Sequence, residues 1–266
     1  MTKWESGDVT LWHGDAMEVL RSIPEDSVDV LLCDPPYSSG GTFRGDRQGK
    51  TVDKYVIGMQ NVNPSFTGDN RDQRAWTYWC SLWLGLCASA AKPTAYACVF
   101  TDWRQLPSLT DATQAGGWLW RGIVPWDKTE GSRPQKGWFR AQCEYIITAT
   151  RGPMKQEQER AGPCLPGYLD FDGYYRGRTP AAERLHQTSK PVDLMTVLLS
   201  FAGDGAVILD PFAGSGPIGV ACVMRGLRYI GIEQSAEYFD ITKARIVKAQ
   251  NDAPLFKGRE KQLGLL

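Results

Sequence analysis

The sequence predicts a doubly wound α/β fold with a seven-stranded, mostly parallel sheet. Short apolar runs recur along the chain, and helical patterns of apolar residues lie between them. Strands that alternate with helices in this way are typical of a parallel sheet with helices on both faces. The predicted strands are Val9–His13, Val28–Cys33, Ala95–Phe100, Trp118–Val124, Tyr145–Thr150, Ala206–Leu209 and Arg228–Ile232. The predicted helices are Ala16–Ser22, Gln73–Ala91, Pro191–Ala202, Pro217–Arg225 and Ser235–Gln250.

The composition is that of a globular protein. At 266 residues the chain can bury a full core as one domain. Hydrophobic residues make up 42% and charged residues 23% of the sequence, which excludes a disordered chain. Lys plus Arg and Asp plus Glu both number 30, so the net charge gives no support to a nucleic-acid partner. Such a partner would have to be recognised by local patches.

The cysteines and the N-terminal segment indicate the compartment. The seven cysteines include no Cys-x-x-Cys pair, and most lie in apolar runs where a thiol behaves as a small hydrophobic side chain. This pattern predicts a reducing compartment and no metal. The segment MTKWESGDVT lacks the features of a signal peptide, and no stretch approaches the roughly 18 apolar residues that span a bilayer. We expect a soluble, cytoplasmic protein with no membrane partner.

Two long stretches interrupt the alternation of strands and helices. Ser38–Asp72 is rich in Gly, Asn, Arg and Thr, and Gly152–Leu185 carries Gly, Pro, Tyr and charged residues without a clear period. Loops of this length in a compact domain are usually functional or disordered.

The segment Ala206–Glu233 has the pattern of a nucleotide-binding unit: a strand, a glycine turn, a helix, a second strand and an acid. Gly214 and Gly216 allow a sharp turn close to a ligand, and the Glu233 carboxylate can accept both hydroxyls of a ribose. The acidic Asp210 before the turn would repel a pyrophosphate, which favours a ligand with a ribose and a cation but no phosphate. The alternative is a purely structural glycine turn.

A second motif, Asp34-Pro35-Pro36-Tyr37, directly follows a predicted buried strand, at the sheet edge where open α/β folds bind ligands. The two prolines restrict the backbone, so side chains and carbonyls are presented rigidly. Asp34 and the Pro35 carbonyl can accept the two hydrogens of an exocyclic amine, and Tyr37 can stack on a base that is flipped out of a duplex. The alternative is a rigid turn with Tyr37 as a core ring.

Together these motifs resemble the β group of the DNA amino-methyltransferases, in which DPPY marks mainly adenine-N6 enzymes and SPPY mainly cytosine-N4 enzymes. The resemblance implies a Rossmann-like, S-adenosylmethionine-dependent methyltransferase fold with a circularly permuted motif order. Two residues depart from the family pattern: Gln187 stands where proline is common, and Pro217 replaces a common threonine and its hydroxyl. The segments that carry the resemblance are LWHGDAMEVL, SVDVLLCDPPY, HQTSKPVDLM, DPFAGSG and IGIEQSAEYFDITKARI.

The resemblance also implies a domain organisation and a strand arrangement. Residues 1–150 would form the catalytic half of one domain, 151–185 an inserted target-recognition region, and 186–266 the cofactor-binding half. Because the cofactor strands come last in the chain, Ala206–Asp210 should be central in the sheet, and Val9–His13 should neighbour Arg228–Ile232.

The same resemblance implies roles for individual residues. Glu233 would hold the cofactor ribose, Asp15 the adenine amino group and Lys190 the carboxylate, with Asp34 near the methionine amine. The implied catalytic residues are Asp34, Pro35, Pro36 and Tyr37. The implied cofactor-binding residues are Asp15, Asp34, Lys190, Asp210, Phe212, Gly214, Ser215, Gly216 and Glu233.

The expected partner is double-stranded DNA, in a bacterial cell or a phage-infected host. Gly131–Arg140 combines basic and aromatic residues with no acid, a mixture that suits phosphates and bases, although a solvated loop with inward-facing rings would have the same sequence. The sequence leaves open whether the chain acts alone or as a homodimer. The candidate DNA-binding residues are Arg44, Arg47, Arg133, Lys136, Arg140, Arg176 and Arg178.

The leading hypothesis is therefore an adenine-N6 DNA methyltransferase. The enzyme alternatives are methylation of cytosine N4, of an RNA base or of a protein amine. The motif of cytosine-N4 enzymes mainly begins with Ser, and that of related protein-methylating enzymes begins with Asn. Asp34 at this position therefore disfavours these two alternatives. The non-enzyme alternative is an inactive DNA-binding relic, which the intact tetrapeptide and glycine turn disfavour.

Overall fold

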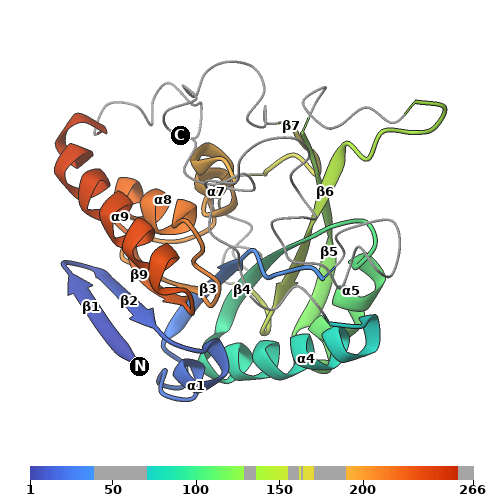
Figure 1. Cartoon of the computed structure of the whole chain (residues 1–266), viewed down its shortest axis with the longest axis horizontal. Helices are drawn as coiled ribbons and strands as arrows, with labels where there is room; N and C mark the ends of the chain where they lie inside the picture. Colours follow the sequence, from blue (N-terminus) through green and yellow to red (C-terminus); the bar gives the residue numbers. More distant parts are fainter. Residues whose placement is uncertain (39–70, 129–135, 155–161, 163, 171–189, 257–266) are drawn as a thin grey trace.

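The computed structural model describes residues 1–38, 71–128, 136–154, 162, 164–170 and 190–256. These residues form one nine-stranded sheet with helices on both faces (Figure 1). The strands are β1 Thr2–Ser6, β2 Val9–His13, β3 Val28–Cys33, β4 Ala91–Thr101, β5 Leu119–Asp127, β6 Cys143–Thr150, β7 Leu169–Asp170, β8 Val207–Asp210 and β9 Arg228–Glu233. The helices are α1 Ala16–Leu20, α4 Gln73–Ala90, α5 Leu106–Ala115, α7 Val192–Leu198, α8 Pro217–Arg225 and α9 Ala236–Phe256.

The strand order is β1-β2-β9-β8-β3-β4-β6-β5-β7, and the central strands from β2 to β4 are parallel. Strand β6 runs antiparallel to both β4 and β5, and β1 forms an antiparallel hairpin with β2. The mostly parallel α/β fold predicted from the sequence is therefore confirmed, but the sheet has nine strands where seven were predicted. The predicted pairing of β2 with β9 is also confirmed, from Val9 opposite Tyr229 to His13 opposite Glu233.

Three elements were not predicted from the sequence, for a shared reason. Strand β1 is largely exposed, α5 is built mainly from small and polar residues, and β7 has only two residues. None of them carries an apolar run, so hydrophobic periodicity gave no signal. They are held by their neighbours instead, β1 through its hairpin with β2 and α5 through its packing on α4.

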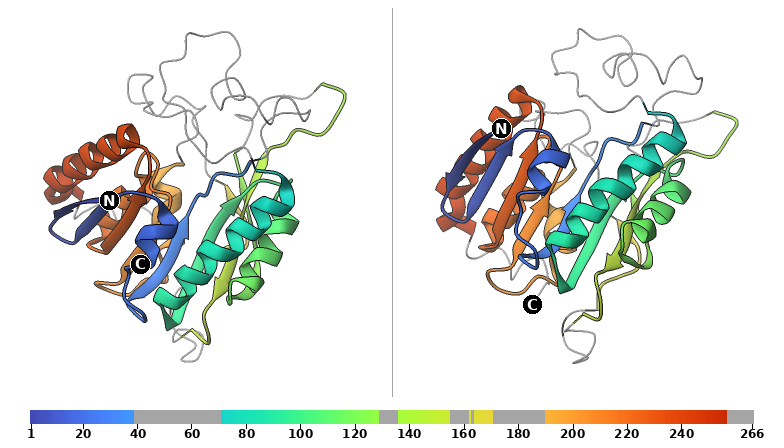
Figure 2. Two further views of the ribbon diagram at one scale, coloured as in Figure 1. Left: turned by 60° about the horizontal axis from the view of Figure 1, so that its bottom comes forward. Right: turned by 90° about the horizontal axis from the view of Figure 1, so that it is seen from below.

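The core has two layers, one on each face of the sheet. Helices α1, α4 and α5 pack on one face, and α7, α8 and α9 pack on the other (Figure 2). Strand β3 contributes to both layers because successive side chains point to opposite faces: Leu31 lies in the first layer, Leu32 in the second. A strand that is buried on both faces reads as a continuous apolar run, as the last four residues of β3, VLLC, do.

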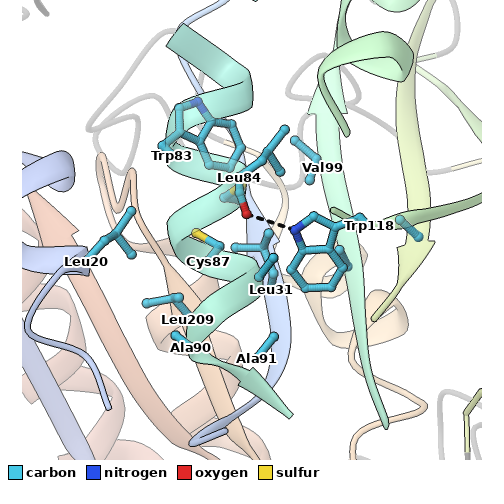
Figure 3. Packing of buried hydrophobic residues seen from close by; sticks show 14 of the residues in the cluster. Leu20, Leu31, Trp83, Leu84, Cys87, Ala90, Ala91, Val99, Trp118 and Leu209 are labelled. Carbon is cyan, nitrogen blue, oxygen red and sulfur yellow. Dashed lines mark hydrogen bonds between the residues drawn. The ribbon is translucent and has the colours of Figure 1, made fainter. Parts of the chain in front are cut away.

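Helix α4 lies against the first face with tryptophans at its centre. Trp83 is fully buried, and Trp118, directly before β5, donates its indole N–H to the carbonyl of Leu84 at 3.0 Å (Figure 3). Burying an aromatic ring of this size is worth about 1.5–3 kcal/mol or more. This packing holds α4 against the strand that leads to Asp34. No helix in the described ranges is long and apolar enough to cross a bilayer.

Strands β3 and β8 lie side by side in parallel, with Leu31 opposite Leu209. The Asp29 carboxylate accepts from the backbone N–H of Val207 at 2.9 Å, which ties the beginnings of the two strands together. The segments that follow the two strands therefore emerge at the same sheet edge. This register places the Asp-Pro-Pro-Tyr motif beside the glycine turn.

Candidate active site

The Asp-Pro-Pro-Tyr turn is held in place by two buried side chains from other elements. Trp76 of α4 donates its indole N–H to the carbonyl of Pro36 at 2.7 Å. Gln105, after β4, donates its amide N–H to the carbonyl of Tyr37 at 2.9 Å. Neither bond uses the Pro35 carbonyl, the predicted second acceptor for a target amine. The turn is thus a positioned platform rather than a free loop.

The side chains of this turn belong to a charge cluster that we define as Asp34, Tyr37, Lys128, Glu144 and Lys190. The Lys190 side chain is only 6% exposed, and its ammonium donates to Asp34 Oδ2 at 2.6 Å and lies 3.1 Å from Glu144 Oε2 and 3.3 Å from the Tyr37 hydroxyl oxygen. Lys128 donates to Glu144 Oε1 at 3.0 Å. Tyr37 donates its hydroxyl proton to Asp34 Oδ1. Two cations and two carboxylates therefore neutralise each other.

Burial and charge act in opposite directions on this cluster. Burial raises the pKa of Asp34, and the adjacent Lys190 counteracts that rise. Burial also opposes ionisation of Glu144, but Lys190 and Lys128 together lower its pKa to about 2. Burial lowers the pKa of Lys190, and the two carboxylates more than compensate, so that it lies above its usual value. Glu144 is therefore an anion and Lys190 a cation at neutral pH.

Lys190 was expected to reach the carboxylate of the cofactor. In the structure each of its three ammonium protons has an acceptor within the charge cluster. A contact with a further carboxylate would have to replace one of these bonds. In the structure, Lys190 compensates the charges of Asp34 and Glu144.

The glycine turn after β8 has the sharp, left-handed backbone that its sequence suggested. Gly214 and Gly216 have φ values of +54° and +78°, the left-handed region that favours glycine. A Cβ on Gly216 would lie 2.8 Å from the side chain of Thr242. Thr242 in turn donates to the carbonyl of Gly214 at 2.6 Å, and Arg245 donates to the carbonyl of Ser215 at 2.6 Å. Helix α9 thus clamps the turn from one side.

Glu233 lies at the end of β9, directly beside this turn. Its carboxylate accepts from the backbone N–H of Gly214 at 2.8 Å and from that of Ser235 at 2.7 Å. The backbone N–H of Gln234 is a third partner. A carboxylate offers about four acceptor sites, so these bonds leave capacity for a ribose hydroxyl. Because Glu233 also links the turn to α9, it supports the fold as well.

Asp210 lies beneath the glycine turn and is fully buried. It accepts from the Tyr229 hydroxyl at 2.9 Å and from the backbone N–H of Phe212 at 3.2 Å. Burial raises the pKa of Asp210 to about 8, although the bonds from Tyr229 and Phe212 act in the opposite direction. Asp210 supports the turn from below.

Two further predicted cofactor residues lie at the same sheet edge. Asp15 follows β2 and accepts from the backbone N–H of Met17 at 2.8 Å, so it caps helix α1. Phe212 packs against Trp79 and Trp83 of α4, with ring centroids 5.4 and 5.1 Å away. The aromatic side of α4 therefore connects the glycine turn with the Asp-Pro-Pro-Tyr turn.

The sequence did not identify Glu144, Lys128, Gln105 or Trp76 as part of this site. Glu144 lies just before the predicted strand Tyr145–Thr150, and an acid at the start of an apolar run was its only signal. Gln105 and Trp76 act through side-chain bonds to backbone carbonyls, for which local sequence gives no sign.

Of the candidate DNA-binding residues, Lys136 and Arg140 are described. They flank an exposed aromatic pair, Trp138 and Phe139, which are 72% and 83% exposed with ring centroids 5.6 Å apart. The alternative of inward-facing rings is therefore wrong for this pair. Arg44, Arg47, Arg133, Arg176 and Arg178 lie outside the described residues, as does Gln187.

Comparison with known proteins identifies the class of this protein, the enzymes that methylate DNA. The model of the N6_N4_Mtase family, described as DNA methylase, matches residues 28–244. The chain is a member of that family. The matched range runs from the start of β3 into α9 and so contains both the Asp-Pro-Pro-Tyr turn and the glycine turn.

One relative and two solved structures illustrate the likeness. The chain is 31% identical over 239 residues to the putative methylase YubD of Escherichia coli K12, with 90% of each chain covered. The crystal structure of the M1.HpyAVI-SAM complex aligns with a TM-score of 0.63 at 20% identity, covering 90% of this chain and 98% of that one. The cytosine-N4-specific PvuII DNA methyltransferase aligns with a TM-score of 0.67 at 14% identity, covering 93% of each.

Proposed function

We propose that this DNA methylase is an adenine-N6 methyltransferase that flips its target base out of double-stranded DNA and methylates the amine by direct attack. The observation that carries this proposal is Asp34, which heads the Asp-Pro-Pro-Tyr turn at the end of β3, beside the glycine turn that follows β8. An exocyclic nitrogen has its lone pair delocalised into the ring. Accepting its hydrogens on Asp34 and the Pro35 carbonyl favours a more pyramidal, nucleophilic nitrogen.

The cofactor is S-adenosylmethionine, which supplies an electrophilic methyl group on a sulfonium. The residues present fit it, because two left-handed glycines bring backbone close to a ligand and Glu233 retains acceptor capacity beside them. Glu233 accepts the ribose hydroxyls and Asp15 lies at the end of β2 for the adenine amino group. The M1.HpyAVI-SAM structure, a complex with this cofactor, has the same fold.

The distinction between adenine and cytosine has a direct test. DNA methylated by the purified protein is digested to nucleosides, and the modified nucleoside is identified by mass spectrometry. N6-methyladenine is the expected product. N4-methylcytosine would replace the proposal with the activity for which the PvuII enzyme is named. Methylated RNA or protein in place of DNA would overturn it altogether, and an Asp34→Ala preparation controls for contaminating enzymes.

The same proposal assigns a function to each part of the chain. Residues 1–150 and 186–266 provide the catalytic and cofactor halves of one domain, and 151–185 takes part in target recognition. Trp138 and Phe139, with Lys136 and Arg140 beside them, offer stacking faces and cations to DNA. Their exposure supports a surface role, since apolar rings of this size are usually buried.

Tyr37 is expected to contribute a stacking face. Tyr37→Ala removes that face, which is typically worth about 1–3 kcal/mol per base, so capture of the flipped base should weaken and the reaction should slow. Tyr37→Phe keeps the ring and should restore much of the activity. A 2-aminopurine at the target position reports extrusion through its fluorescence. Equal activity of the Ala and Phe variants would remove the stacking role.

Glu233 is expected to contribute to cofactor affinity. Glu233→Ala should weaken S-adenosylmethionine binding by about 1.5–3 kcal/mol, the scale of hydrogen bonds to a charged group, as measured by calorimetry. Loss of the bonds to Gly214 and Ser235 should also lower the melting temperature. Glu237→Ala, which removes an exposed acid from the first turn of α9, is the matched control and should leave affinity unchanged. Unchanged affinity in Glu233→Ala would exclude Glu233 from the site.

A further inference from the structure

The hydroxyl of Tyr37 lies between two carboxylates but has one proton to donate. It donates that proton to Asp34 Oδ1. Glu144 Oε2 lies 3.4 Å from the same hydroxyl oxygen, which makes it a second acceptor. Lys190 Nζ, at 3.3 Å, donates to the hydroxyl oxygen itself. Rotation about the C–O bond is therefore enough to move the proton from one carboxylate toward the other.

This arrangement creates a conflict in the proposed reaction. Asp34 Oδ2 is bonded to Lys190, so Oδ1 is the oxygen whose present partner is uncharged and exchangeable. A target amine that binds Oδ1 competes with the Tyr37 hydroxyl for it. A part-buried hydroxyl that loses its acceptor costs free energy unless another acceptor is in reach.

Resting on the proposed function, we propose that Glu144 is a positioning residue that accepts the Tyr37 hydroxyl when the target amine takes Asp34 Oδ1. Glu144 thereby lets Asp34 act on the amine without leaving the phenol unsatisfied. It does not touch the reacting nitrogen.

Several features of Glu144 suit this task. It is the second residue of strand β6, whose antiparallel pairing places Tyr145 opposite Thr101 and so brings Glu144 to the edge where β4 ends. Lys128, directly after β5, and Lys190 hold its two oxygens at 3.0 and 3.1 Å, so its position is set from both sides. The charged and titratable groups that face it are Lys128, Lys190, Asp34 and Tyr37. With two cations beside it, Glu144 stays an acceptor throughout the neutral range.

A double-mutant cycle tests the proposal. Glu144→Gln leaves one acceptor oxygen for three donors, namely Lys128, Lys190 and the Tyr37 hydroxyl. Single-turnover methylation, with DNA and cofactor saturating, should fall about tenfold or more in the otherwise native protein, the factor expected for loss of a bond to a charged group. In the Tyr37→Phe background no hydroxyl needs an acceptor, and the loss should be about threefold or less. DNA affinity should change little, so the effect falls on the rate rather than on binding.

A matched control separates this role from general stability. Asp29→Asn alters another paired carboxylate, at the opposite end of β3, where Asp29 binds Lys92 at 2.8 Å. It should change the rate by the same factor with Tyr37 or with phenylalanine, and melting temperatures confirm that each variant is folded. If Glu144→Gln caused the same loss in both backgrounds, or no loss with Tyr37 present, Glu144 would not act through the hydroxyl.

The product of the same reactions separates this proposal from the proposed function. If the product is N4-methylcytosine and the coupling is present, adenine specificity fails and the role of Glu144 stands, because both bases offer an exocyclic amine. If the product is N6-methyladenine and the coupling is absent, adenine specificity stands and the role proposed for Glu144 fails.

Discussion

Replacing Asp34 by alanine is expected to reduce the single-turnover rate of methyl transfer by about 100- to 1,000-fold or more. This is the range seen when one preorganised bond to a reacting group is removed. The fold should survive, because Lys190 keeps Glu144 as a partner at 3.1 Å and no buried charge is left alone. The measurement is rapid-quench methylation with saturating DNA and cofactor, beside DNA binding by fluorescence anisotropy, which should change little.

The pH dependence of the native protein provides an independent check of the same residue. Burial raises the pKa of Asp34, and the reaction requires the ionised form. Activity should therefore be lost, as pH falls, at a value above the roughly 3.9 of an ordinary aspartate. Asp34→Asn retains one acceptor oxygen and should abolish this acid limb while keeping a low residual rate. A near-normal rate in Asp34→Ala would show that the tetrapeptide is only a structural turn.

Replacing Lys190 by methionine is expected to give the largest loss of stability, about 3–5 kcal/mol in the free energy of unfolding. The Lys190 side chain is 6% exposed, and removal of its ammonium leaves Asp34 and Glu144 facing each other without a compensating charge between them. Urea unfolding at neutral pH measures the effect. Lys92→Met is the matched control: its pair with Asp29 is more exposed, so its loss should be at most about 1 kcal/mol.

The defect of Lys190→Met should depend on pH in a defined direction. Without the cation, the two carboxylates repel each other, so the folded-state pKa of one of them rises above its unfolded value. The destabilisation is then greatest at neutral and alkaline pH and is relieved as the pH falls through that raised pKa, because the carboxyl becomes neutral. A loss that is independent of pH between 5 and 8 would show that Lys190 acts by packing rather than by charge.

Much of the fold was predictable because its strands are buried on both faces. The runs VLLC in β3 and AVIL before Asp210 are continuous and apolar, and each strand was found within a few residues of its observed bounds. The position of the two motifs was predictable for the same reason, since parallel strands end at one edge. Strand β1 and helix α5 carry no such pattern, because β1 is largely exposed and the buried side of α5 is made mainly of small and polar residues.

The polar contacts within the site were not predictable, because they depend on pairing between distant strands. Glu144 reaches Lys190 only because β6 runs antiparallel to β4 and begins where the parallel strands end. Local sequence gives neither the direction nor the register of that pairing. Gln105 and Trp76 likewise act on backbone carbonyls across 68 and 40 positions of the chain.

The strand order also has a consequence for how the chain reaches this structure. Strands β2 and β3 follow one another in the sequence, yet β8 and β9 lie between them in the sheet. During synthesis, the two early strands emerge well before the pair that must separate them. They have to remain apart, or part again, until residues 207–233 arrive. Such long-range pairing slows folding and exposes unpaired strand edges in the meantime. The sheet edge that carries the two motifs is therefore one of the last parts of the structure to assemble.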